Sequence, residues 1–157
     1  MRYEKVNLSE KLIVGVKDRT SSLLESEYEE AKIPMLWRTY FQSSILSPIP
    51  DECENSPAYA LYYEYEDGMS AEYSVLVGTE VSQTKNIKNE YEHTKIQKGE
   101  YLRFDASGPL PETVIKLWQD IWKFFEQNKE YERVFRSDFE VYSGEEDVSI
   151  YIGIKEV

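Results

Sequence analysis

Apolar residues recur at helical spacing in two parts of the chain. In the second half they fall at i, i+3, i+4, i+7, i+8 and i+11, which predicts one continuous helix face: Val114, Leu117, Trp118, Ile121, Trp122 and Phe125. Pro111 suits the first helical position, because the N–H that proline lacks has no partner there. Pro34 has the same place in a second predicted helix, whose apolar face holds Ile33, Trp37, Tyr40 and Phe41. A capping box of Ser22 and Glu25 indicates a separate helical turn before that helix.

Near the C-terminus the pattern changes to strict alternation, in "SDFEVY" and "DVSIYIGI", which predicts a β-hairpin. We expect its packed face to hold Phe139, Val141, Val148, Ile150, Ile152 and Ile154. We expect the other face to mix carboxylates with tyrosines: Asp138, Glu140, Tyr142, Ser149 and Tyr151. In a similar hairpin before residue 82 we expect an apolar face of Tyr63, Tyr65, Tyr73, Val75 and Val77, opposite Tyr62, Glu64, Glu66, Ser74 and Leu76.

The second half of the chain repeats the order of patterns in the first. "VGVKDRTS" reads against "YLRFDASG", "MLWRTYF" against "KLWQDIW", and "YEY…EYSVLVGTEV" against "FEV…DVSIYIGIKEV". This predicts an α+β fold in which two pseudo-symmetric strand-helix-strand-strand units form an antiparallel sheet with two main helices. The units span approximately residues 1–82 and 90–157 of a single domain, 1–157, and the polar run "SQTKNIKNEYEHTK" between them is expected to be a connector or exposed loop. The alignment makes Glu64 the counterpart of Glu140, and Gly78 that of Gly153.

Composition limits the function classes. With 30 acidic against 18 basic residues the net charge is −12, which argues against direct binding of nucleic acid and mildly favours cationic partners. One histidine, His93, and one cysteine, Cys53, leave no zinc site and no Ser-His or Cys-His nucleophile system, so we expect no metal and no cofactor. The chain shows no signal-peptide pattern and no apolar run long enough to cross a membrane, so we expect a cytoplasmic protein without membrane contact.

Glu140 is the residue on which the functional interpretation depends. An ionised carboxylate is rarely buried without a partner, so Glu140 either faces water on the wet side of a sheet or receives a positive group. We favour the second alternative.

Several motifs together resemble the GyrI-like small-molecule-binding superfamily, the effector-binding domain of AraC- and MerR-type regulators, and most closely its stand-alone, integron-associated members. They are "GEY", "GPLPE", "LW…W", "DFEVY" and "IYIGI". The resemblance implies a paired antiparallel α+β unit that binds lipophilic, planar cationic or drug-like molecules for multidrug sensing or sequestration. Its acidic pocket residue corresponds to Glu140 and the aromatic residue of its last strand to Tyr151. Many relatives have a second Glu where this chain has Ser149.

An aromatic pocket with a carboxylate suits an organic cation, because ring faces attract positive charge. Besides Glu140 and Tyr151, we expect the ligand to contact helix and strand aromatics: Trp37, Tyr40, Tyr62, Phe104, Trp118 and Trp122. For each tryptophan, packing in an ordinary core is an equally good interpretation. Glu64 is expected to face solvent, since the family pattern singles out the second copy.

Two other functions stay open at this stage. Some superfamily members resemble hydrolases of strained-ring genotoxins, and Glu140 and Tyr151 could supply general acid–base catalysis in such an enzyme. Others resemble gyrase modulators, which implies a protein partner.

Overall fold

The computed structural model describes residues 2–27, 31–68 and 70–156. Its three helices are α1 (Ser22–Ser26), α2 (Ile33–Leu46) and α3 (Glu112–Gln127). Its nine strands are β1 (Tyr3–Leu8), β2 (Lys11–Ser21), β3 (Ala58–Tyr63), β4 (Glu72–Val81), β5 (Glu92–Ile96), β6 (Gly99–Ser107), β7 (Tyr131–Arg133), β8 (Ser137–Tyr142) and β9 (Asp147–Glu156).

All strand pairs are antiparallel, in the order β1-β6-β9-β8-β3-β4-β2-β5, and the short β7 adds to β9. The predicted α+β class with an antiparallel sheet is confirmed. The order strand, helix, strand, strand recurs, with the short α1 inserted, in β2-α2-β3-β4 and, with β7 inserted, in β6-α3-β8-β9. The β3–β8 pair joins these two sets of strands at the middle of the sheet.

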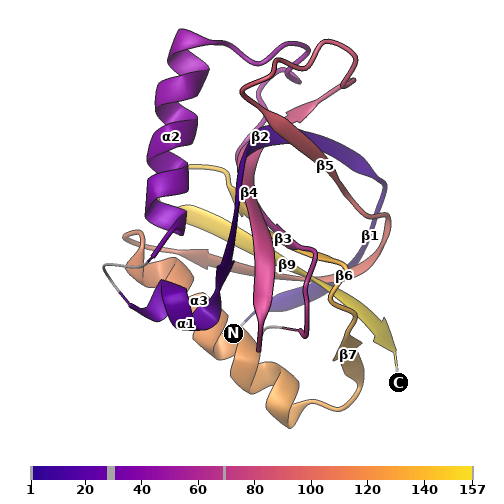
Figure 1. Cartoon of the computed structure of the whole chain (residues 1–157). Helices are drawn as coiled ribbons and strands as arrows, with labels where there is room; N and C mark the ends of the chain where they lie inside the picture. Colours follow the sequence, from indigo (N-terminus) through magenta and orange to yellow (C-terminus); the bar gives the residue numbers. More distant parts are fainter. Residues whose placement is uncertain (1, 28–30, 69, 157) are drawn as a thin grey trace.

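The sheet curls strongly (Figure 1). Strands β1 and β2 lie near opposite ends of the strand order, yet only Ser9 and Glu10 separate them in the chain. In the same way, only Gln97 and Lys98 join β5 at one end to β6 near the other. Two-residue links cannot span a flat sheet of this width, because neighbouring strands are about 4.8 Å apart. The sheet must therefore bend until its two ends approach each other.

Curling gives the sheet two packed faces. The helices α2 and α3 cover the outer face (Figure 1), and Leu36, Tyr40, Leu117 and Ile121 bury their side chains there. We call this layer the helix-side core. The concave face is filled by strand side chains alone, which form the inner core: Ile13, Tyr59, Leu61, Tyr63, Leu76, Ile96, Tyr101 and Phe139.

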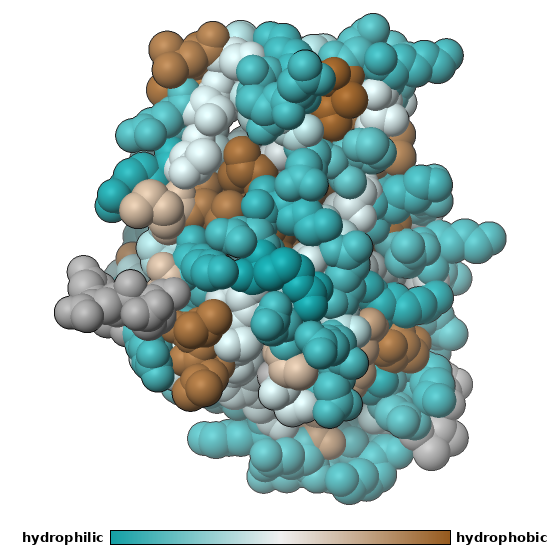
Figure 2. Space-filling view, in the orientation of Figure 1, coloured by the Kyte–Doolittle hydropathy of each residue, from teal (hydrophilic) through white to brown (hydrophobic). Residues whose placement is uncertain are grey.

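The predicted helices are present, with small corrections at their ends and faces. Helix α3 begins at Glu112 with Pro111 as its N-cap, and α1 is capped by the Ser21 hydroxyl instead of the predicted Ser22. Phe41 is 53% exposed and Trp122 44% exposed, so these two lie at the edge of their apolar faces. Figure 2 shows more hydrophobic surface at the upper end of α2, where Ile45 and Leu46 are exposed.

The segment predicted as a connector is only partly a loop. Residues 92–96 form β5, which pairs with β2 although its sequence is polar. A strand at the edge of a sheet needs few apolar side chains, because only part of its surface meets the core. His93 lies on this strand and is exposed.

The predicted strand faces were wrong by one residue. Glu140 pairs with Ile150 and Tyr142 with Val148, so Glu140 shares the helix-side face with the aliphatic residues of β9. Phe139 instead turns to the inner core, where its ring stacks on Tyr151 at 4.6 Å and 7°. An odd number of residues lies between the members of each pair. Even-numbered residues of both strands therefore share one face, and odd-numbered residues share the other.

The first hairpin needs the same correction, because an even number of residues separates its paired positions. Tyr62 pairs with Val75, and Tyr63 with Ser74. Tyr62 therefore joins Tyr73 and Val75 in the helix-side core, while Tyr63 lies in the inner core.

Strands β2 and β4 approach unusually closely at Gly15 and Gly78. A Cβ on Gly78 would lie 2.1 Å from the carbonyl oxygen of Val14, a contact that only a backbone shift could relieve. We expect Gly78→Ala to lower the free energy of unfolding by about 3 kcal/mol or more. Gly144→Ala, where the new Cβ meets only the Asp147 side chain, should cost less than about 1 kcal/mol. Urea denaturation measures both, and equal losses would contradict this explanation.

Candidate functional site

The candidate site is a carboxylate in the middle of an apolar row. Across six neighbouring strands the helix-side face presents one residue per strand, in the order Phe104, Ile150, Glu140, Ala60, Val77 and Val16. Glu140 has Ile150 on one side and the small Ala60 on the other. Its side chain is only 4% exposed, so the alternative of a water-facing Glu140 is excluded.

Three neutral donors hold the Glu140 carboxylate. The Tyr62 hydroxyl and the Trp118 indole N–H both donate to Oε2, at 2.8 and 2.7 Å. The Tyr142 hydroxyl donates to Oε1 at 2.5 Å. The donors come from β3, α3 and β8, so strands and helix must pack together before the carboxylate is satisfied.

Burial dominates the electrostatics of this group. It raises the pKa of Glu140, and the hydrogen bonds from Tyr142, Trp118 and Tyr62 offset only part of that rise. Burial, together with the nearby carboxylate, also raises the pKa of Tyr62 and Tyr142, so both stay neutral donors. Among the described residues no lysine or arginine forms an ion pair with Glu140.

Asp138, two residues earlier on the same face of β8, is fully buried and has a cation. The Arg133 guanidinium lies 2.7 Å from its Oδ2, which also accepts from Tyr65 at 2.6 Å. Its Oδ1 accepts the backbone N–H of Gly153 at 2.8 Å. The two carboxylates thus differ in one respect that matters: Asp138 is neutralised inside the fold, and Glu140 is not.

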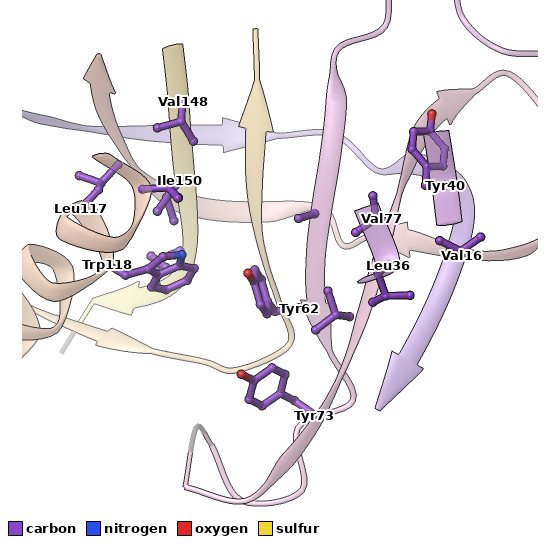
Figure 3. Packing of buried hydrophobic residues seen from close by; sticks show 14 of the residues in the cluster. Val16, Leu36, Tyr40, Tyr62, Tyr73, Val77, Leu117, Trp118, Val148 and Ile150 are labelled. Atoms are coloured by element: carbon purple, nitrogen blue, oxygen red, sulfur yellow. The ribbon is translucent and has the colours of Figure 1, made fainter. Parts of the chain in front are cut away.

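Aromatic rings surround the Glu140 carboxylate. Trp118 and Tyr62 point toward the same space (Figure 3), with ring centroids 5.5 Å apart. Trp122 lies behind Trp118 at 6.2 Å, and Trp37 of α2 packs edge-on against Tyr142 at 5.3 Å. Of the predicted ligand contacts, the structure therefore places two, Tyr62 and Trp118, in contact with Glu140. Two others, Trp37 and Trp122, lie one layer further out.

Three other predicted residues lie away from the carboxylate. Tyr40 is buried beside Trp37, at 6.5 Å, and burial raises its pKa to about 12. Phe104 lies on the same face as Glu140 but two strands away, which is about 10 Å, and packs against Phe124. Tyr151 is on the opposite face of the sheet.

The position of Tyr151 corrects the predicted catalytic pair. Because the β8–β9 register puts Tyr151 in the inner core and Glu140 in the helix-side core, the sheet itself separates them. They cannot act together on one substrate atom. Ser149, also on the Tyr151 side, donates to Asp105 at 2.5 Å.

Sequence reasoning missed Tyr142 as a site residue. It stands two positions after Glu140 on one strand, where side chains share a face. The alternation had placed Tyr142 on that face, but Tyr142 was not among the predicted ligand contacts. Glu64, by contrast, is exposed as expected and forms an ion pair with Lys17 at 2.8 Å.

Other site types find no support in the described part of the chain. No group of three or more His, Cys, Asp or Glu side chains there could hold a metal ion. None of the helices in the described ranges is long and apolar enough to span a membrane.

Comparison of the sequence with known proteins assigns the chain to a family. The sequence model described as "integron-associated effector binding protein" matches residues 6–154. The chain belongs to this family. It is also 30% identical, over 156 residues and 95% of each chain, to YobU of Bacillus subtilis (strain 168), which is named as a transcriptional regulator protein.

Solved structures agree with this assignment to the integron-associated effector binding proteins. The chain is similar to the integron cassette protein VCH_CASS2 of Vibrio cholerae, with a TM-score of 0.83 and 26% identity over 98% of this chain and 95% of that one. SAV2435, solved bound to tetraphenylphosphonium, has a TM-score of 0.79 at 17% identity over 99% and 94%. At that identity the likeness to SAV2435 shows the fold.

The raised pKa of Glu140 in this effector binding protein has a consequence for stability. A raised folded-state pKa stabilises the protein most below the unfolded-state pKa, about 4.3, and this contribution is lost as pH rises through the folded-state pKa. The unfolding free energy of the wild type minus that of Glu140→Gln should therefore fall between pH 4 and pH 8, by about 1.4 kcal/mol per unit of pKa shift. Urea titrations at each pH measure it. A difference that is constant or rises with pH would contradict a desolvated carboxylate.

Asp138 should behave differently, because its substitution leaves the Arg133 charge buried and unpaired. We expect Asp138→Asn to lower the free energy of unfolding by about 3–5 kcal/mol. The control is Glu132→Gln, which breaks the exposed pair with Lys155 at 3.7 Å and should cost less than about 1 kcal/mol. Thermal or urea unfolding at pH 7 separates the two, and a cost below 1 kcal/mol for Asp138→Asn would refute the structural role.

Proposed function

We propose that this protein binds lipophilic organic cations, with Glu140 as the anionic contact and the surrounding rings as the walls of the site. The observation that carries the proposal is a buried carboxylate that has three neutral donors and, in the described part of the chain, no cation. A bound cation would supply the missing charge. It would also lower the pKa of Glu140, because an opposite charge nearby favours the ionised form.

The rings favour a bulky cation with delocalised charge. Each ring face attracts a cation by roughly 0.5–2 kcal/mol, depending on how well the site excludes water. An ion with spread charge loses its hydration at low cost, whereas a small metal ion does not. Specificity would then come from charge and shape more than from directed hydrogen bonds, which fits a sensor or sequestering protein for many drug-like compounds.

The comparisons with known proteins support this proposal. The family is described as effector binding, and a protein of the same fold was solved with tetraphenylphosphonium, a bulky organic cation. YobU is named as a transcriptional regulator protein, so ligand binding here could serve regulation through a protein partner. Catalysis by Glu140 and Tyr151 has no support, since the sheet separates the two.

Paired probes of equal shape and opposite charge test the proposal. Tetraphenylphosphonium should quench tryptophan fluorescence saturably, because Trp118 contacts Glu140, whereas tetraphenylborate should bind about tenfold more weakly or not at all. Glu140→Gln should weaken tetraphenylphosphonium binding by about tenfold or more, and affinity for the wild type should rise with pH through the raised pKa of Glu140.

The matched control is Tyr151→Phe, which removes a hydroxyl from the opposite face of the same hairpin and should change the affinity less than about twofold. Equal binding of the two probes, or unchanged binding by Glu140→Gln, would overturn the proposed function.

A further inference from the structure

A surface hollow shares one lining residue, Tyr142, with the Glu140 site. It has a volume of about 580 Å³ and is lined by Asn55, Ser56, Pro57, Ala58, Tyr142, Ser143, Gly144 and Glu145. The hollow therefore lies between the segment that enters β3 and the turn that joins β8 to β9. One lining residue, Tyr142, also belongs to the Glu140 site.

We propose that this hollow is the entry subsite for cationic ligands and that Tyr142 is the gate between it and Glu140. The proposal rests on the proposed function, since it concerns how the same ligands reach the same carboxylate. It adds a place where the ligand first binds and a residue that controls its passage.

The geometry around Tyr142 carries the inference. Tyr142 is partly exposed and lines the hollow, while its hydroxyl reaches inward to Glu140 Oε1 at 2.5 Å. One residue thus both lines the surface hollow and contacts the buried carboxylate. Its ring is held from the side by the edge contact with Trp37 at 5.3 Å and 89°.

Small residues leave room for Tyr142 to turn outward. On β3 the residue paired with Tyr142 is Ala58, and the residue paired with Glu140 is Ala60. Both alanines face the helix side, so no large side chain of β3 blocks the way from the hollow to the carboxylate. Rotation of Tyr142 about its Cα–Cβ bond would break one hydrogen bond and open this path.

The charge of the hollow suits a cation. Glu145 lines it, and none of its described lining residues is a lysine or an arginine. Glu146 follows in the same turn and Asp147 begins β9, and both are exposed. A negative rim raises the local concentration of cations and so speeds their association, mainly at low ionic strength.

Stopped-flow fluorescence with tetraphenylphosphonium distinguishes a gate from a wall. Tyr142→Phe keeps the ring but loses the hydrogen bond that closes the free site, so the association rate constant should rise by about tenfold while dissociation changes little. If Tyr142 is only part of the wall, dissociation will change and association will not, which overturns the gate. Tyr151→Phe, on the opposite face, should change neither rate.

Charge reversal tests the route. Glu145→Arg should slow association by about threefold at low salt, and the effect should vanish at high salt. Glu126→Arg, at the exposed end of α3, is the matched control. Equal slowing by both variants would show that only the net charge matters and would overturn the entry subsite.

A measurement without ligand keeps the gate separate from the proposed function. The Trp118 indole N–H is buried against Glu140, and its hydrogen exchange requires the site to open. In Tyr142→Phe this exchange, followed by NMR, should accelerate by about tenfold, and in Tyr151→Phe it should not. Unchanged exchange in Tyr142→Phe overturns the gate even if the cation binds. Failure of the cation to bind while exchange accelerates overturns the proposed function and leaves the gate standing.

Discussion

The burial of one carboxylate among neutral donors is the constraint around which the rest of this structure is organised. Glu140 interrupts an apolar row that runs across six strands, and it is tolerated there because Tyr62, Trp118 and Tyr142 each donate a hydrogen bond. A buried carboxylate without these donors would destabilise the packing of α3 on the sheet. The donors therefore allow the fold to close while the negative charge stays uncompensated.

The contrast with Asp138 shows that the fold can neutralise a buried carboxylate where it needs to. Asp138 and Glu140 are two residues apart on one face of β8, yet only Asp138 has an arginine. The Arg133–Asp138 pair ties β7 to β8 and, through the backbone of Gly153, to β9. This pair is part of the scaffold, whereas the described residues provide no such cation for Glu140.

The strand registers also explain why only one half of the chain carries this site. Tyr59 pairs with Gly78, and continuing the β8–β9 register places Ser137 opposite Gly153. If Gly78 corresponds to Gly153, as the sequence alignment has it, Tyr62 and not Glu64 is the counterpart of Glu140. The first unit thus has a hydrogen-bond donor where the second has an acceptor, and the two meet at 2.8 Å.

The sequence by itself determined the α+β class, both main helices and the presence of two hairpins, because these depend on local periodicity. It also singled out Glu140, which the structure buries, because an ionised carboxylate is costly to bury. It did not determine which residues share the face of Glu140. Alternation is a property of one strand, but the relation between two strands depends on how many residues separate their paired positions, and a change of one residue exchanges the faces. For that reason Tyr151 was expected beside Glu140 and lies behind it. Only the tertiary structure brings Tyr62, Trp118 and Tyr142 to one carboxylate. The reason is that β3, α3 and β8 are distant in the sequence, and local sequence patterns do not determine how they pack.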